Sequence, residues 1–235
     1  MGWLSEAVAK CALTSDMEEY LYGRGAQEAT ILDEGCVTWH RLEEPSPDPV
    51  FAKRYGNFGE RLEGFLVIPV RSPKGSFIGM EARNISVKYL SDWREVEAEW
   101  NPFMIGTRRA VEKLWAGGDA WIVEGFFDKC PLEWVVPSGD AVLATVTAKL
   151  AIRHVEFLRR HCRGWVHMVY DRDEAGRRGS EGYADSSNKR HWGALDALRR
   201  VGLKCRDVPY SGGKDPGELW DRGGVQALKA AFPTI

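Results

Sequence analysis

The sequence predicts an α/β protein in two parts, an α+β part over residues 1–117 and a part with a central parallel sheet over residues 118–235. Two observations predict the parallel sheet. After Gly117-Gly118, short apolar runs alternate with segments of helical character, as in sheets whose strands are joined by helices. Three of the apolar runs end in acidic residues, and the ligands of parallel sheets bind beyond the carboxyl ends of the strands.

The first part is expected to contain short helices and one hairpin. Ser15 and Glu18 have the spacing of a capping box, with Ser15 as the N-cap, and predict a helix that ends near Gly23. The segment RSPKG is rich in turn residues and joins two apolar runs, which predicts a hairpin. Residues 84–101 are polar and irregular. The predicted elements are helices over 15–23, 27–33 and 107–116 and strands over 64–70 and 76–83.

The second part has the alternation of a Rossmann-like domain. Residues 180–188 are polar and rich in Gly and Ser, which predicts a surface insertion, and Trp192 beside it is the tryptophan best placed for an exposed contact. The predicted strands cover 120–124, 134–137, 165–170 and 203–208, and the predicted helices cover 126–133, 147–161, 174–201 and 223–231.

Composition excludes several classes of protein. No apolar run approaches the roughly 18 residues of a membrane span, and no basic segment followed by an apolar one marks a secretion signal. We therefore expect a cytoplasmic protein without a membrane partner. The five cysteines are scattered, which argues against a zinc site and a disulfide framework. A net charge of -2 does not suit a protein that coats nucleic acid through bulk charge, although a local basic face stays possible.

Five acidic residues are the candidate site. Glu124 and Asp128 follow the first apolar run, Asp171 and Asp173 follow the next, and Asp215 follows the last. Neighbouring carboxylates repel one another, so a protein keeps them ionised together when a cation compensates. Ligand sets made only of oxygen favour hard ions, which here indicates Mg²⁺ or Mn²⁺. Such sites usually act on phosphates, and Glu124 is the best placed general base.

Several sequence motifs resemble those of a known family. The E-G-x-x-D of Glu124–Asp128, the VYDRDEAGRR of Val169–Arg178 and the KDP of Lys214–Pro216 resemble the TOPRIM domain of DnaG-type bacterial and phage primases. Upstream, YLYGRGAQEATI at Tyr20–Ile31 is similar to the Y-L-x-x-R-G segment of these primases. IPVRSPKGSFIGMEAR and the Lys88-Tyr89-Leu90 that follows it also match, so that the resemblance covers, with gaps, about residues 15–232.

The resemblance implies a role for each site residue. Glu124, Asp128, Asp171 and Asp173 would be catalytic, with Glu124 as the acid/base. The metal ligands, of two ions in the typical site, would be Glu124, Asp171, Asp173 and Asp215. The residues that bind nucleotide or template would be Arg71, Arg83, Lys88 and Lys214. The implied reaction joins ribonucleoside triphosphates into a short RNA primer on single-stranded DNA and releases pyrophosphate.

The resemblance also implies partners and leaves alternatives open. At position 213 a glycine stands where the family has an acidic residue. We also expect 235 residues to leave no room for a zinc module or a helicase-binding domain. A separate zinc module or a replicative helicase would then act in trans. A phage or mobile element is the expected source, and a bacterial or infected cell the expected location. A TOPRIM nuclease and a non-catalytic nucleic-acid-binding module are the alternatives. Arg24 suits a helix turn and a nucleic-acid contact equally well. Arg177 and Arg178 suit phosphate or acidic partners, and an exposed helix face is the alternative for both.

Overall fold

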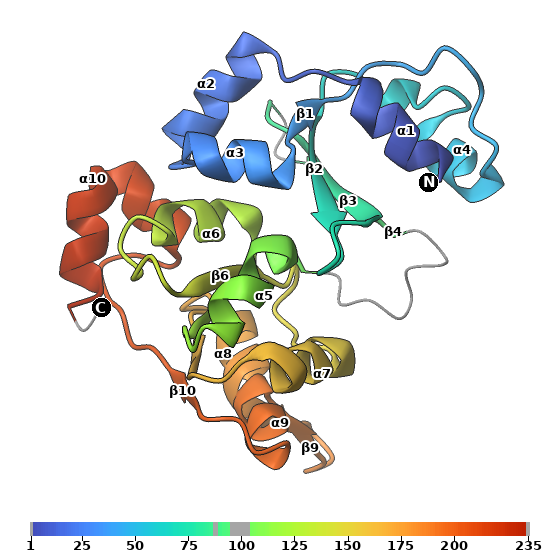
Figure 1. Ribbon diagram of the computed structural model, residues 1–235. Helices are drawn as coiled ribbons and strands as arrows, with labels where there is room; N and C mark the ends of the chain where they lie inside the picture. Colours follow the sequence, from blue (N-terminus) through green and yellow to red (C-terminus); the bar gives the residue numbers. More distant parts are fainter. Residues whose placement is uncertain (1, 87–88, 95–103, 234–235) are drawn as a thin grey trace.

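The structure, a computed structural model, describes residues 2–86, 89–94 and 104–233 (Figure 1). None of the helices in these ranges combines the length and apolar character needed to cross a membrane. The helices are α1 (Trp3–Lys10), α2 (Ser15–Gly23), α3 (Glu28–Glu34), α4 (Pro49–Tyr55), a 3₁₀ turn (Glu60–Leu62), α5 (Thr107–Trp115), α6 (Phe126–Leu132), α7 (Ile152–His161), α8 (Glu174–Glu181), α9 (Ala194–Arg200) and α10 (Pro216–Ala231).

The antiparallel sheet of the first half contains the predicted hairpin. Its order is β1-β2-β3-β4, and the strands are β1 (Val37–Thr38), β2 (Leu66–Arg71), β3 (Phe77–Asn84) and β4 (Tyr89–Arg94). Successive side chains of β2 enter different cores: Leu66 and Ile68 pack toward the second half, whereas Val67 packs with the residues of α1 and α4. Both faces of β2 are therefore buried, which explains its nearly continuous apolar sequence.

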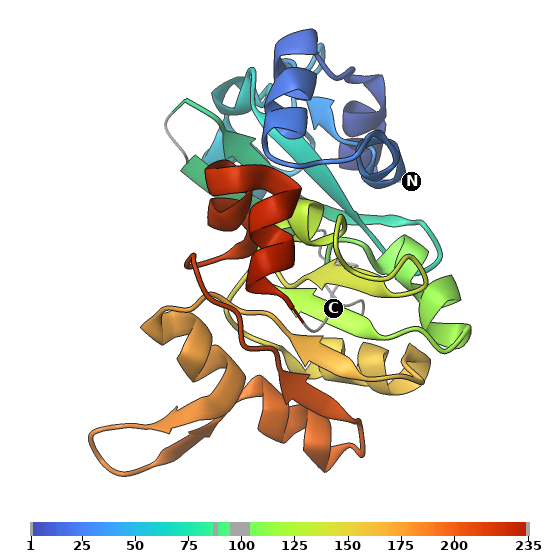
Figure 2. The ribbon, with the colours of Figure 1, turned by 90° about the vertical axis from the view of Figure 1, so that its left-hand side faces the viewer.

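The second half is built on the parallel sheet that the alternation predicts, and the α/β fold class is confirmed. The order is β10-β7-β5-β6, all pairs are parallel, and the strands are β5 (Ala120–Val123), β6 (Ala141–Ala144), β7 (Val166–Met168) and β10 (Cys205–Asp207). Trp121 and Val123 of β5 share a core with α6 and α10, whereas Ile122 packs in the core of α5, α7 and α9. Helices thus cover both faces of this sheet (Figure 2).

Several predicted boundaries are wrong. Residues 134–137 form turns after α6, and the strand that pairs with β5 is Ala141–Ala144. Helix α7 begins at Ile152 and not at Thr147, because the backbone of its N-cap Ala151 is extended, with a ψ of 159°. The N-cap of α2 is Thr14, and its backbone N–H is held by the hydroxyl of Thr38.

The last helix and the irregular segment also differ from the prediction. Helix α10 begins at Pro216, well before Gly223, and is kinked at Gly223-Gly224. β4 lies within residues 84–101, for which no strand is predicted. The polar insertion forms a hairpin of β8 (Gly182–Ala184) and β9 (Arg190–Trp192), which pairs with neither larger sheet.

A buried ion pair network joins the two halves. The ammonium of Lys129 on α6 lies 3.3 Å from Glu34 of α3 and 2.8 Å from Glu133. Burial alone would lower the pKa of Lys129, but Glu133 and Glu34 outweigh it and raise that pKa.

Helix α5 lies before residue 117 and packs against β6 of the second half. The division of the chain between residues 117 and 118 stays a prediction.

We expect replacement of Lys129 to destabilise the protein strongly. Lys129→Met would leave the buried Glu34 without its cation, which typically lowers the free energy of unfolding by about 3 kcal/mol. Urea denaturation measures this change, and adding Glu34→Gln to Lys129→Met should restore part of the loss. Lys10→Met, at an exposed position of α1, is the matched control and should change stability by less than about 0.5 kcal/mol. Equal stability of both single variants would contradict the expectation.

Candidate metal centre

The carboxyl ends of the parallel strands bring the predicted acids together. Glu124 directly follows β5, Asp171 follows β7, and Asp215 precedes α10, the helix reached from β10. Asp128, Asp171 and Asp215 each place a carboxylate oxygen within 4.8 Å of the others. Glu124 adjoins this group, since its Oε1 accepts a hydrogen bond of 3.1 Å from the backbone N–H of Asp171.

Backbone N–H groups hold the other carboxylates in position. Asp173 is the N-cap of α8 and accepts from Gly176 N at 2.9 Å. Asp215 is the N-cap of α10 and accepts from Glu218 N at 2.6 Å. Helix N-termini favour negative charge, so two of the acids occupy the positions that suit them best.

Asp128 connects α6 with α10. One oxygen accepts from Gly125 N at 3.1 Å, and the other from Gly217 N at 3.4 Å. A Cβ at position 217 would lie only 3.0 Å from the backbone oxygen of Phe127, so glycine permits this close approach. The position of Asp128 thus depends on the packing of the last helix.

Burial and mutual repulsion change the acidity of the group. Burial, aided by the charge of Asp171, raises the pKa of Glu124 to about 7. Burial also raises the pKa of Asp128, with a contribution from Asp215, and that of Asp171. The hydrogen bond from Gly176 lowers the pKa of the more exposed Asp173. Three carboxyls therefore hold their protons more tightly than in water, as expected of acids that are buried beside one another.

Lys214 compensates part of this repulsion. Its ammonium lies 3.0 Å from Asp171 Oδ2 and 3.1 Å from Asp173 Oδ2, and these two bonds raise its pKa. The side chain of Lys214 is half exposed, so it can leave the carboxylates without unfolding its surroundings. A metal cation that bound these carboxylate oxygens would therefore compete with the ammonium of Lys214.

The donor set fits a hard divalent cation. Asp128, Asp171 and Asp215 offer only oxygen atoms at a spacing that a single ion can span. Burial raises the pKa of Asp128 and of Asp171, and a bound cation would favour their ionised forms. The predicted ligands Glu124 and Asp173 lie beside this trio, held by Asp171 N and by Lys214. Their role as ligands stays a prediction.

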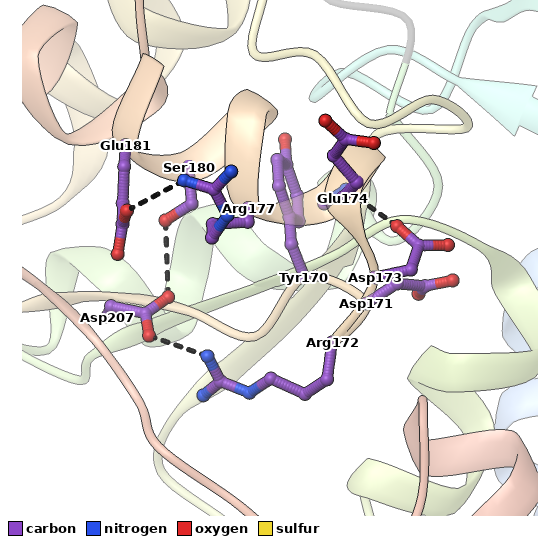
Figure 3. Close-up of a pocket in the computed structure, with 10 residues that line it drawn as sticks. Tyr170, Asp171, Arg172, Asp173, Glu174, Arg177, Ser180, Glu181 and Asp207 are labelled. Carbon is purple, nitrogen blue, oxygen red and sulfur yellow. Dashed lines mark hydrogen bonds and ion pairs between the residues drawn. The ribbon is translucent and has the colours of Figure 1, made fainter. Parts of the chain in front are cut away.

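The arginines that follow Asp171 pair with acids away from this trio. Figure 3 shows Arg172 directed at Asp207, at 2.9 Å, and Arg177 directed at Glu181, at 3.9 Å. Arg178 pairs with Glu174. A cavity of about 350 Å³ lies between these pairs and the Asp171–Asp173 loop. Arg177 and Arg178 thus pair with acids one turn away on α8, and both side chains are about half exposed, as on an exposed helix face.

Two arginines of the first half contact the ring of Phe127, the residue before Asp128. The guanidinium of Arg83 lies 4.4 Å from the centre of the Phe127 ring, and that of Arg24 lies 5.5 Å from it. Arg24 also pairs with Asp221 of α10. Arg71 instead donates to Gly75 O within the hairpin turn, at 3.4 Å. Lys88, the fourth predicted cation, lies outside the described residues.

The turn that carries Arg24 is held by two tryptophans. The indole N–H of Trp134 donates to Gly25 O at 2.8 Å, and that of Trp220 donates to Gly23 O at 2.9 Å. The two indoles stack with their centres 5.7 Å apart. Gly25 has a φ of 84°, and a Cβ there would lie 2.9 Å from the Trp220 ring. The Y-L-x-x-R-G motif is thus packed against α6 and α10.

The chain is similar in sequence to two curated DNA primases, while no family model matches it. It is 28% identical to the DNA primase of Aquifex aeolicus over 176 residues, which cover 70% of this chain and 31% of that protein. It is 27% identical to the DNA primase of Thermotoga maritima over 194 residues, which cover 80% of this chain and 31% of that protein. The chain therefore spans about a third of the length of these relatives.

The solved structures agree with this similarity. The RNA polymerase domain of Mycobacterium tuberculosis primase DnaG matches 98% of this chain and 81% of its own length, with a TM-score of 0.66 and 20% identity. The chain has the fold of a DnaG-type primase core. A second primase of this fold, a DnaG catalytic domain bound to single-stranded DNA, matches 93% of the chain and 71% of its own length, with a TM-score of 0.60 and 19% identity.

Several residues near the acids were not predicted to belong to the site. For Arg24, a helix turn and a nucleic-acid contact were both open, and the structure shows a turn held by tryptophans and a guanidinium beside Phe127. Phe127, Trp134 and Trp220 were not singled out. Their signal in the sequence is weak, because it consists only of aromatic residues next to the motif glycines and acids.

The acidity of Glu124 predicts how stability depends on pH in the absence of metal. A carboxyl whose pKa rises from 4.5 to about 7 on folding binds more protons in the folded state between these values. Its contribution to stability is present below pH 4.5 and is lost by about pH 7. We therefore expect the melting temperature in EDTA to fall as the pH rises over this range, and to fall less in Glu124→Gln. Identical pH profiles for the two proteins would contradict this assignment.

The ion pairs of Lys214 predict how its replacement changes the affinity for a metal ion. Because its ammonium competes with a cation for Asp171 and Asp173, Lys214→Gln should bind Mn²⁺ about two- to fivefold more tightly in calorimetric titration. Lys204→Gln, outside these ion pairs, is the matched control and should leave the affinity unchanged. Weaker Mn²⁺ binding in Lys214→Gln would show that the lysine supports the ion rather than competes with it.

Proposed function

We propose that this chain is the catalytic core of a DNA primase, which joins ribonucleoside triphosphates into a short RNA primer on single-stranded DNA. The observation that carries the proposal is the position of an oxygen-only cluster of acids, Asp128, Asp171 and Asp215, at the carboxyl edge of the sheet. Arg24 and Arg83 each place a guanidinium over the ring of Phe127, the neighbour of Asp128 in the chain. Acids and cations in this arrangement suit a triphosphate and its metal ions.

The acids would hold Mg²⁺ or Mn²⁺, one ion or two, with Glu124 and Asp173 adding to the trio. A bound ion of this kind stabilises negative charge on the phosphates and increases the acidity of an attacking hydroxyl. Glu124, with a pKa of about 7, would accept the proton of that hydroxyl at and above neutral pH. Asp215 and Asp173 would keep their orientation through the helix N-termini that they cap.

The cations would bind phosphate groups. Arg24 and Arg83 have planar guanidinium groups near the acids, and Lys214 would turn toward the triphosphate once an ion takes its place at Asp171. The DnaG catalytic domain of the same fold is bound to single-stranded DNA in its structure, which supports a single-stranded template for this chain. Arg71 and Lys88 would extend the basic surface of the first half toward that template.

The greater length of the relatives supports the proposal that partner proteins act with this core. Each curated primase is longer than the part that this chain matches. We propose that a replicative helicase or a zinc-binding module acts together with this core in the replication of a phage or mobile element. Primer synthesis with and without these proteins, added in trans, tests this part separately.

A primer-synthesis assay tests the function itself. With Mg²⁺ or Mn²⁺, single-stranded template and labelled ribonucleotides, the wild-type chain should make short RNA. Glu124→Gln should lower the rate by about 100-fold or more, because it removes the proton acceptor and changes the charge of the site. Glu112→Gln, on the exposed face of α5, is the matched control. Thermal melting checks that both variants fold.

The same assay separates the alternatives. A TOPRIM nuclease would use the same acids and would degrade DNA or RNA without added nucleotides. A non-catalytic module would bind nucleic acid equally well in EDTA. The absence of primers under all metal and partner conditions would reject the primase proposal, and full activity of Glu124→Gln would reject the role of that residue.

A further inference from the structure

The β8–β9 hairpin carries exposed aromatic side chains beside a large cavity. Tyr183 and Trp192 are 41% and 54% exposed, respectively. They line a cavity of about 550 Å³, whose floor is formed by small residues of α8, α9 and the 148–151 loop. The hairpin projects from the body of the second half (Figure 2). It pairs with neither of the larger sheets, so the fold does not depend on it for a core strand.

The hairpin is nevertheless well ordered by its own hydrogen bonds. Asp185 accepts from the backbone N–H groups of Ser187, at 2.9 Å, and Lys189, at 3.0 Å, and pairs with His191 at 2.9 Å. At its base the strands approach so closely that a Cβ on Gly193 would lie 2.3 Å from the nitrogen of Gly182. A surface extension held in this way presents its side chains in fixed positions.

Cations cover the aromatic rings. The guanidinium of Arg200 lies 3.7 Å from the centre of the Trp192 ring, and that of Arg190 lies 4.8 Å from it. Tyr183 stacks on His191 with a 4.6 Å separation and a 10° interplanar angle, and Arg178 lies 5.1 Å from its ring. Alternating aromatic and guanidinium planes are the groups on which unpaired bases stack.

The charge around the cavity is positive on balance. Arg190 pairs with Asp196 at 3.2 Å, and Arg178 pairs with Glu174. Among the residues described, no carboxylate forms an ion pair with Lys149, Lys189 or Arg200. The positive charges of these three residues are therefore not neutralised by an ion pair and can attract phosphate groups. An apolar floor, stacking planes and unpaired cations together match a single strand of nucleic acid better than a protein surface.

The cavity also lies close to the acid cluster. Helix α8 begins at its N-cap Asp173 and reaches the cavity through Ala175, Arg178 and Gly179. Five residues of α-helix separate Asp173 from Arg178, a rise of roughly 8 Å. A strand that passes the acids can therefore continue over α8 onto the hairpin.

We propose that the β8–β9 hairpin and its cavity bind single-stranded DNA, with bases against Tyr183 and Trp192 and phosphates at Lys149 and Arg200. The assignment to DNA rests on the proposed function, since a template is the longer strand at a priming site. The acids hold the reacting end, and the hairpin holds the strand beyond it.

Anisotropy with fluorescein-labelled oligo(dT) of about 20 nucleotides tests this proposal on the full chain. Tyr183→Ala and Trp192→Ala should each weaken binding roughly tenfold. Trp192→Phe, which keeps a stacking ring, should restore most of the affinity. Trp115→Ala, at another exposed tryptophan, on α5, is the matched control and should bind as the wild type does. Lys149→Gln should reduce the slope of log affinity against log salt by about 0.7.

Photocrosslinking with 5-iodouracil in the same oligonucleotide locates the contact directly. A crosslink within residues 181–193 or 148–151 or at Arg200 supports the proposal, and crosslinks confined to other segments overturn it. Unchanged binding in both alanine variants also overturns it and would leave the hairpin as a surface for a protein partner. Oligo(rU) that displaces the DNA crosslink at much lower concentration would overturn the choice of DNA. These readouts require no synthesis, so they remain valid if primer synthesis fails.

Discussion

The mutual repulsion of carboxylates at one edge of a sheet is the constraint on which the rest of this structure depends. Asp128, Asp171 and Asp215 come from three separate segments and converge because parallel strands end on the same side. The negative charges are stabilised by backbone N–H groups, by the N-termini of α8 and α10, and by the ammonium of Lys214. Burial, together with the charge of Asp171, raises the pKa of the adjoining Glu124 to about 7. A bound cation would oppose both effects by favouring the ionised carboxylates.

The alternation of strands and helices could be read from the sequence because it reflects local pattern. The parallel pairing of the sheet was expected for the same reason, whereas the strand order β10-β7-β5-β6 was not predicted. The errors arose where local preference and long-range pairing disagree. Trp134–Pro137 contains β-branched residues typical of strands, yet it turns after α6, while the less distinctive run Ala141–Ala144 pairs with β5. Nothing in the residues of either segment identifies its partner.

The site was predictable to the level of its acids. Their positions at the ends of predicted strands placed five acids in one site, and the structure brings carboxylate oxygens of Asp128, Asp171 and Asp215 within 4.8 Å of one another. Asp128 was predicted as a catalytic acid and not as a metal ligand. The distribution of positive charge was not predictable in the same way. Lys214 adjoins Asp215 in sequence but contacts Asp171 and Asp173, and Arg24 reaches the site from α2, 197 residues before its partner Asp221. Such contacts depend on how helices pack, which motif spacing does not encode.

The tryptophan-held turn of Arg24 has a consequence for the energetics of ligand binding. Two indole hydrogen bonds and a left-handed glycine fix the backbone on both sides of this arginine, and its guanidinium rests near Phe127. A residue whose backbone is already fixed loses less conformational entropy on binding a ligand, so more of the interaction energy appears as affinity. Folding therefore positions the Arg24 turn before any ligand arrives. Lys214 differs, because its half-exposed ammonium is held by ion pairs with Asp171 and Asp173.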